Sequence, residues 1–323
     1  SFIEEAELNE KMTARIIGIG AYAPEQVVTN QDLTKFLDTN DAWIRERTGI
    51  GARHISTSEG TSALATEAAK RAIADAGISP EEIEIVIVAT SSPDRAFPSA
   101  AADVQGAIGA KHAVAFDITA ACSGFIYALH IVQGFIQAGI YKTALIIGAE
   151  TLSKVLDWTD RSSCILFGDG AGAAVVRADE TGVVKTLVGS DGTKNDVLYC
   201  QARSLENCLT GGRPELGFMQ MDGQEVFKFA VKKVPEIVNA ILEETGTDRE
   251  AVQHYLLHQA NIRILEAASR RLKVPMDKIT VNIERYGNTS AASIPTSIVS
   301  IASACRPRAM MLSSTTCSAM ERR

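Results

Sequence analysis

A helix, a glycine and a short apolar strand follow one another between residues 61 and 90, and this unit restricts the possible folds more than any other feature. The alanine-rich segment Ser62–Ala76 is predicted to be helical, and Gly77 is predicted to stop it. Ile83–Ala89 has the apolar, β-branched composition of a strand buried on both faces. A helix that leads into such a strand is typical of α/β proteins, in which helices cover a largely parallel sheet.

The same unit occurs a second time, with Gly246 following Gly77 by 169 residues. Its predicted helix is Val226–Glu244, and its predicted strand, Val252–Leu257, aligns with the first strand without a gap. Such units recur in many α/β proteins, so coincidence is the alternative to duplication. We interpret the pattern as two similar halves, an N-terminal half over residues 12–182 and a C-terminal half over residues 183–323.

Three further apolar runs are predicted to be strands of the first half, buried on both faces: Ala113–Ile118, Ala144–Ala149 and Ala171–Arg177. With 323 residues, of which 46% are hydrophobic, the chain can bury a large core, which argues against a disordered or purely structural protein. Residues 1–11 are acidic and lack apolar runs, so we interpret them as a leader or a frayed arm.

Composition also excludes several classes of function. No apolar run reaches the roughly 18–20 residues of a membrane helix, and no secretory pattern is present at the N-terminus, so we expect a cytoplasmic protein that does not enter a membrane. The six cysteines have no zinc-ligand spacing, which predicts neither a metal site nor a disulfide framework. The net charge of −7 argues against general nucleic-acid binding.

Cys122 is the first candidate catalytic residue, because it lies between the predicted strand Ala113–Ile118 and the predicted helix Gly124–Gln137. At such an elbow, unpaired backbone N–H groups and the helix dipole stabilise a thiolate. The alternative is a small core cysteine. We favour a nucleophile that carries an acyl group as a thioester, because the small neighbouring residues leave room for a substrate.

His258 and Asn288 are the other two candidates. His258 ends the second predicted strand, at the sheet edge where α/β proteins usually present catalytic groups, although a lone histidine often has a structural role. Asn288 lies in a turn that is ordinary by itself. Spacing does not show that these side chains converge on Cys122. Decarboxylation of a malonyl thioester, however, forms an enolate that two side-chain donors can stabilise without a metal.

Seven longer motifs make the chain resemble the β-ketoacyl-acyl carrier protein synthase III family, the initiating condensing enzymes of type II fatty acid synthesis. The resemblance extends from about Arg15 to Pro295, and the motifs are Asp41–Ile50, Ala96–Ala100, Asp117–Phe125, Phe167–Ala171, Glu225–Lys228, His258–Arg263 and Tyr286–Ser290. It implies an α/β fold with thiolase-like duplicated halves in a five-layered αβαβα sandwich. It also implies a homodimer.

The resemblance implies a decarboxylative Claisen condensation of a short acyl-CoA with malonyl-acyl carrier protein. Coenzyme A enters this reaction as a thioester substrate, and the family needs no cofactor and no metal. Two alternatives remain open: a related condensing enzyme of secondary metabolism with another primer or acceptor, and a non-catalytic thiolase-fold partner protein. The branching of the primer is not decided by the resemblance.

Roles for individual residues also follow from the resemblance. The catalytic triad falls on Cys122, His258 and Asn288. Trp43 and Arg161 are expected on either side of the adenine of coenzyme A, and Arg47 and Thr48 at its nucleotide end. Gly223 and Asn261 are expected along the pantetheine tunnel, and Phe97 at the acyl pocket across the dimer. The residues expected to dock the carrier protein are Lys228, Gln259, Arg263, Arg270 and Arg271. Gln224 departs from the Asn that is common beside this glycine.

The end of the chain departs from the family pattern. Family members finish with an apolar strand, a glycine-rich loop that gives a backbone donor to the oxyanion hole, and a closing strand, whereas residues 306–323 contain no glycine. Codons that encode Pro307–Thr315 can, one base out of phase, spell the expected turn and strand. We therefore expect either a frame slip in the sequence from about Ala304 or an impaired enzyme, since an oxyanion donor is typically worth on the order of a hundredfold to a thousandfold in rate.

Overall fold

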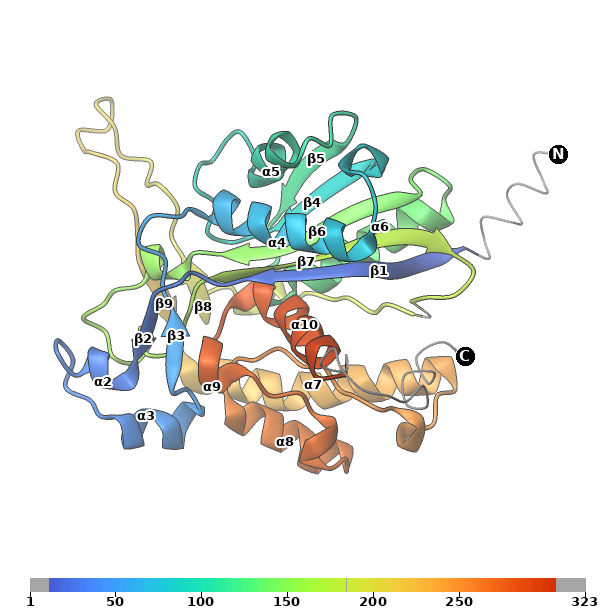
Figure 1. The fold of residues 1–323 in the computed structure, drawn as a ribbon. Coiled ribbons are helices and arrows are strands. Elements are labelled where there is room, and N and C mark those ends of the chain that lie inside the picture. The colour runs from blue at the N-terminus through green and yellow to red at the C-terminus, as the bar shows by residue number, and fades with distance from the viewer. Residues whose placement is uncertain (1–11, 184, 306–323) are drawn as a thin grey trace.

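A mixed five-stranded sheet is the centre of the computed structural model, which describes residues 12–183 and 185–305 (Figure 1). Its strand order is β1-β7-β6-β4-β5; β4 pairs in parallel with β5 and β6, and β7 pairs antiparallel with β6 and β1. The strands are β1 (Thr13–Tyr22), β4 (Ile85–Ala89), β5 (Val114–Ile118), β6 (Thr143–Glu150) and β7 (Gly170–Asp179). The four strands predicted in the first half are all present, with ends that differ by at most two residues.

Helices cover both faces of this sheet (Figure 1). Along β4, Val86 and Val88 face the helices of one side, whereas Ile85 and Ile87 face the other, as the two-residue period of a strand requires. The first side carries α4 (Thr61–Ala76) and α5 (Ala100–Ile108), and the second carries α6 (Gly124–Gln137) and α10 (Ser293–Cys305). A further pair, α7 (Gly223–Thr245) and α8 (Ile262–Leu272), lies beyond α10 (Figure 1).

Shorter elements surround these layers. A long segment between β8 and β9, residues 201–218, projects from the body of the molecule (Figure 1). The remaining strands and α-helices are β2 (Val27–Thr29), α2 (Asn30–Leu33), α3 (Asp41–Thr48), β3 (Ala52–His54), β8 (Leu198–Cys200), β9 (Met219–Met221) and α9 (Ile283–Tyr286). The 3₁₀ turns are η1 (Pro80–Glu82), η2 (Ala121–Ser123), η3 (Leu152–Val155), η4 (Gly192–Lys194), η5 (Arg249–Ala251), η6 (Met276–Lys278) and η7 (Ser290–Ala292).

The helix–glycine unit is present twice, with matching detail at the end of each helix. Gly77 ends α4 and Gly246 ends α7, and both have a left-handed φ, of 66° and 63°, that a side chain would disfavour. The 3₁₀ turns η1 and η5 then follow at the same spacing, capped by the side chains of Ser79 and Asp248. This local correspondence supports duplication, while the division into halves at residue 182 stays a prediction.

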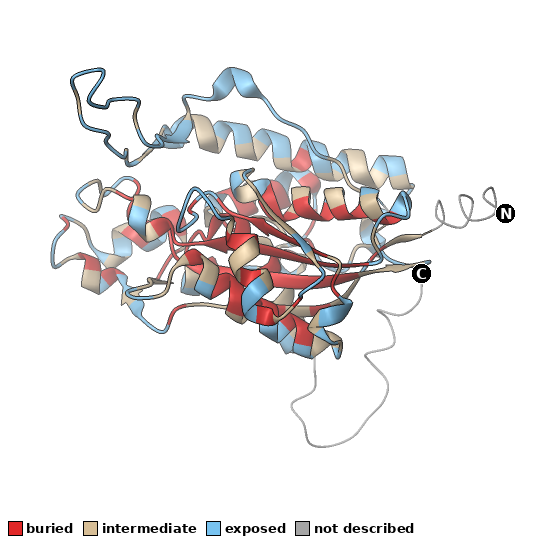
Figure 2. Ribbon diagram, turned by 90° about the horizontal axis from the view of Figure 1, so that it is seen from above, coloured by how far each residue is buried: buried red, intermediate tan, exposed pale blue. Residues whose placement is uncertain are grey.

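The second half differs from the prediction in its strands. Within the described residues, the segment predicted as the strand Val252–Leu257 makes a single bridge, between Tyr255 and Ile279. The described residues therefore contain the first central sheet of the expected five-layered sandwich and not a second one. In α7 only Pro235 is buried, and Ile237 is 44% exposed, so most of this helix is uncovered (Figure 2).

The predictions for residues 1–11 and 306–323, a leader and an atypical tail, lie outside the described residues. In the part of the chain that the structure describes, no helix combines the length and apolar character needed to cross a membrane. Within the same part, no group of three or more acidic, histidine or cysteine side chains is arranged to hold a metal ion.

Candidate active site

Cys122 lies in η2, the short turn that leads from the end of β5 into α6, as the sequence predicts. The preceding residue, Ala121, has a φ of 45°, a left-handed conformation that is rare for a residue with a side chain. Such strained backbone is held by the surrounding structure and is concentrated at functional sites. The turn thus presents a partly buried thiol just before the first residue of α6, Gly124.

The surroundings of Cys122 favour its thiolate. Burial raises the pKa of the thiol, and the charge of Glu150 also raises it. His258 and a hydrogen bond with Ser290 act in the opposite direction and outweigh both effects, so the thiol pKa lies below its ordinary value. A lowered pKa is the property that distinguishes a nucleophilic cysteine from an inert core cysteine.

His258 brings an imidazole to Cys122, and the two side chains interact. Nδ1 and Nε2 are buried and have no other hydrogen-bond partner within the described residues. Leaving buried polar atoms unpaired costs free energy, and catalytic hydrogen bonds often tighten only when substrate is bound. The next residue fixes this segment, because the Gln259 backbone N–H donates to Ser293 Oγ at 2.8 Å, at the start of α10.

Asn288 is buried beside the same turn and is rigidly held. Its N–H donates to the Leu166 carbonyl at 2.8 Å, and its carbonyl accepts from the Gly168 N–H at 3.0 Å. The side-chain Oδ1 accepts from the Ser290 N–H at 2.9 Å, so the amide NH₂ group is the part that can serve a ligand. Ser290 contacts Cys122 as well. The structure therefore brings together all three residues predicted as the triad.

Trp43 lies beside two of the arginines predicted to contact coenzyme A. The Arg47 guanidinium lies over its ring, with Cζ 4.6 Å from the ring centroid, and Arg161 lies over the ring at 5.2 Å. Arg161 Nη1 donates to the Asp38 carbonyl at 2.6 Å, which fixes its position on this surface. Planar guanidinium groups beside an aromatic ring can stack on a base and pair with phosphate.

Of the three other residues predicted to contact the substrate, Thr48 and Asn261 have structural partners and Gly223 is exposed. Thr48 is buried, and its hydroxyl donates to the Ile44 carbonyl and accepts from the Ile50 N–H. Asn261 Nδ2 donates to the Arg47 carbonyl at 2.9 Å, which joins α8 to α3. Gly223 is the first residue of α7 and is exposed. Their contacts with a ligand stay predictions.

The basic residues predicted to receive a carrier protein lie on the surface of α7 and α8, two helices that pack against each other. Lys228 on α7 is exposed and pairs with Glu225 at 2.7 Å. Arg263, Arg270 and Arg271 are exposed on α8. We refer to Lys228, Arg263, Arg270 and Arg271 as the basic surface. We refer to Trp43, Arg47 and Arg161 as the Trp43 cluster. The basic surface adjoins this cluster through Asn261, the N-cap residue of α8.

Gln259 does not belong to this surface, and its predicted role in docking is corrected. The residue is 1% exposed, its Nε2 donates to the carbonyls of Leu257 and Thr280, and its Oε1 accepts from the Asn282 N–H. Such a residue offers nothing to a carrier protein. Phe97, by contrast, is 85% exposed in the loop after β4, where it is available to another surface.

Two polar residues near Cys122 were missed from the sequence. Ser290 belongs to the motif around Asn288, but nothing in a row of small residues shows which hydroxyl faces inward. Glu150 directly follows the apolar run Ala144–Ala149, and an acidic residue at the end of a buried strand is the signal that could have identified it.

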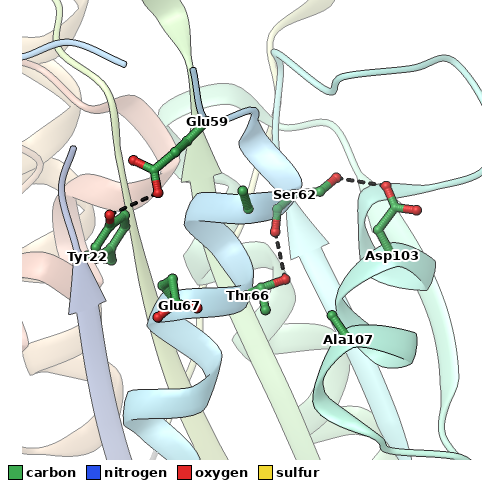
Figure 3. Close-up of a pocket in the computed structure, with 8 residues that line it drawn as sticks. Tyr22, Glu59, Ser62, Thr66, Glu67, Asp103 and Ala107 are labelled. Carbon is green, nitrogen blue, oxygen red and sulfur yellow. Dashed lines mark hydrogen bonds between the residues drawn. The ribbon is translucent and has the colours of Figure 1, made fainter. Parts of the chain in front are cut away.

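A surface hollow of about 490 Å³ lies elsewhere, between α4 and α5 beside the end of β1 (Figure 3). Its acidic groups already have partners, because the Tyr22 hydroxyl donates to Glu59 at 2.9 Å and the Ser62 hydroxyl donates to Asp103 at 2.9 Å. It contains none of the predicted site residues, so the site remains at Cys122.

Solved structures with the same architecture define the class of this protein. The 3-oxoacyl-[acyl-carrier-protein] synthase III of Aquifex aeolicus has a TM-score of 0.84 and 45% identity, with 90% of this chain and 91% of that chain covered. The Pseudomonas aeruginosa enzyme of the same name has a TM-score of 0.83 and 39% identity, with 90% of each chain covered. The fold is that of the thiolase-like condensing enzymes, which are acyltransferases.

Sequence comparisons narrow this class to one family. Family models described as 3-oxoacyl-[acyl-carrier-protein (ACP)] synthase III match residues 116–192 and, for its C-terminal part, residues 242–310. The β-ketoacyl-[acyl-carrier-protein] synthase III of Clostridium acetobutylicum is 50% identical over 288 residues, which cover 88% of this chain and 89% of that protein. The chain belongs to the β-ketoacyl-[acyl-carrier-protein] synthase III family, whose members catalyse the initiating condensation of fatty acid synthesis.

Proposed function

We propose that Cys122 accepts a short acyl group from an acyl-CoA and that the acyl group is then joined to malonyl-acyl carrier protein. In the first half-reaction the thiolate attacks the thioester carbonyl, an acyl-Cys122 thioester forms, and coenzyme A leaves as a thiolate that takes up the proton Cys122 gave up on ionisation. What carries this proposal is the position of Cys122 in the turn η2, between β5 and α6 and beside His258 and Ser290, which lower the pKa of its thiol.

In the second half-reaction, His258 and Asn288 stabilise the enolate that forms when malonyl loses carbon dioxide. The enolate carbon attacks the acyl-Cys122 carbonyl, the bond to sulfur breaks, and a β-ketoacyl thioester of the carrier protein is released. Support comes from the imidazole of His258, which lies beside Cys122, and from the free amide NH₂ group of Asn288. Oxyanion stabilisation requires donors at defined positions, and the hydrogen bonds of the Asn288 backbone hold that residue in place. These steps use no cofactor.

The Trp43 cluster and the basic surface supply the binding contacts. Trp43 with Arg47 and Arg161 is suited to the adenine and phosphates of coenzyme A. Positive charge on α7 and α8 favours an acidic carrier protein, in a chain whose net charge is otherwise −7. Arg271 Nη1 also donates to the Val231 carbonyl at 2.6 Å, so it supports the contact between these helices as well.

We also propose that the enzyme is a homodimer in the cytoplasm. Several large apolar side chains are exposed. They include Phe97 and, on the projecting segment between β8 and β9, Leu205 and Leu209, which are 90% and 92% exposed. Contiguous exposed apolar residues mark protein interfaces, and a second copy would cover them. Phe97 would then reach the acyl pocket of the partner and restrict it to short primers.

The test of the nucleophile is intact-protein mass spectrometry after incubation with acetyl-CoA and a panel of longer and branched acyl-CoAs. The wild-type protein is expected to gain one acyl group, and Cys122→Ala is expected to gain none while it keeps its fold. Cys200→Ala, which removes an exposed thiol, is the matched control and should be acylated like the wild type. Acylation of Cys122→Ala at the wild-type rate would remove Cys122 from the mechanism.

A further inference from the structure

Glu150 is a buried carboxyl next to the candidate site, and the proposed mechanism does not use it. It is the last residue of β6 and is 0% exposed. Its carboxyl accepts from the Ser92 hydroxyl at 2.5 Å, from the Ser91 N–H at 3.1 Å and from the Thr90 hydroxyl at 3.3 Å. No ion pair to Glu150 occurs within residues 12–183 and 185–305. Neutral donors alone satisfy it.

The carboxyl faces the nucleophile because the turn η7 lies directly on the end of β6. At Gly148, two residues before Glu150, an added Cβ would lie 2.0 Å from the Ala291 carbonyl oxygen. This close approach places Ser290 within hydrogen-bonding reach of both Glu150 and Cys122. Ser290 itself has a φ of 48°, so its orientation depends on the surrounding contacts.

We infer that Glu150 is a positioning residue. Its protonated carboxyl holds the Thr90–Ser92 segment and Ser290 around Cys122, and its ionised form opposes ionisation of the Cys122 thiol. The inference rests on the proposed role of Cys122 as the nucleophile. Burial raises the pKa of Glu150 to about 7, so the carboxyl is largely protonated below neutral pH. Above it, a negative charge faces the thiol and disfavours the thiolate.

The other titratable groups near Glu150 are few. Cys122 faces it from η2. Lys154 and Asp94, which lie beyond Thr61, pair with each other at 3.1 Å. The coupling therefore involves mainly the carboxyl and the thiol.

The experiment measures the rate at which iodoacetamide alkylates Cys122 as a function of pH, with the modified residue identified by mass spectrometry. In the wild type, ionisation of Glu150, whose pKa is about 7, should oppose formation of the thiolate and displace the profile to higher pH. In Glu150→Gln the midpoint should fall by about half a pH unit or more, which makes alkylation about threefold faster well below the midpoint and about 1.5-fold faster at the wild-type midpoint. Ser92→Ala removes a donor that favours the charged carboxyl and should lower the midpoint as well.

Asp169→Asn is the matched control, because Asp169 is equally buried and accepts from Ser56 and Ser153 instead. Its midpoint should equal that of the wild type. An unchanged midpoint in folded Glu150→Gln, or an equal fall in Asp169→Asn, would overturn the inference. If Glu150→Gln does not fold, Ser92→Ala decides. Acylation of the wild type by acetyl-CoA is measured separately, so a failed nucleophile is distinguished from a failed role for Glu150.

Discussion

The carboxyl of Glu150 should make the stability of the folded protein depend on pH in a defined direction. Burial raises its pKa from 4.5 to about 7. Between these values the folded protein keeps a proton that the unfolded chain releases. The folded state therefore binds more protons, and the free energy of unfolding falls as pH rises through this range. Above about pH 7 the full cost of the buried charge is present, and below about pH 4.5 it disappears.

The size of this effect follows from the two pKa values. A rise from 4.5 to about 7 corresponds to roughly 3 kcal/mol. The same hydrogen bonds from Thr90, Ser91 and Ser92 stabilise the charged form and are already included in this pKa. Glu150→Gln carries no titrating group at this position, so the difference between the two proteins isolates the contribution of Glu150.

Urea unfolding of both proteins at intervals from pH 4.5 to pH 8 measures the difference. Relative to Glu150→Gln, the wild type should lose on the order of 3 kcal/mol of unfolding free energy over this range. Other groups, including the buried Asp169, titrate equally in both proteins and cancel. Curves that remain parallel from pH 4.5 to pH 8 would show that Glu150 is charged in the folded protein throughout and would refute the reasoning.

Two further predictions concern the second half-reaction. His258→Ala and Asn288→Ala should each reduce the rate of malonyl decarboxylation by about a hundredfold to a thousandfold, because their donors stabilise the enolate. The rate of acylation by acetyl-CoA should fall less. Equal losses in separate assays of the two half-reactions would contradict this division. Reversal of Arg270 and Arg271 to Glu should raise the KM for malonyl-acyl carrier protein about tenfold, with a weaker dependence on salt, and leave acetyl-CoA loading unchanged. Lys111→Glu, on the far side of the sheet, is the control, and unchanged kinetics in the double variant would exclude docking at this surface.

The first half of the fold could be predicted from sequence because its strands are buried on both faces. β4 and β6 are continuous apolar runs, and every residue of each is buried. Gly77 and Gly246 correctly predicted where α4 and α7 end. The strand predicted over Val252–Leu257 has the same composition, but a strand also needs neighbours on which to pair, and composition does not supply them.

The candidate catalytic residues could be predicted from the sequence, whereas their arrangement around Cys122 could be seen only in the structure. Cys122 and His258 were selected from their positions at element ends, and Asn288 from the chemistry of an enolate and the family resemblance. That Ser290 and Asn288 lie beside Cys122 depends on η7 lying against β6. Gln259 was assigned to the surface from the family resemblance alone, but it is 1% exposed and its side-chain amide bonds to backbone groups. Glu150 was missed because its importance comes from what it faces and not from the residues beside it.

The pairing of β1 with β7 has a consequence for the synthesis of this protein. Thr13 lies opposite Asp179, so the N-terminal strand has no partner until the ribosome has made β7. Elongation at about 5–20 residues per second leaves β1 waiting for roughly ten to thirty seconds outside the ribosome. During that time an apolar strand with free backbone groups is available to other nascent chains. Overproduction should therefore be limited by aggregation of the growing chain, and a chaperone that shields β1 should improve the yield of folded protein.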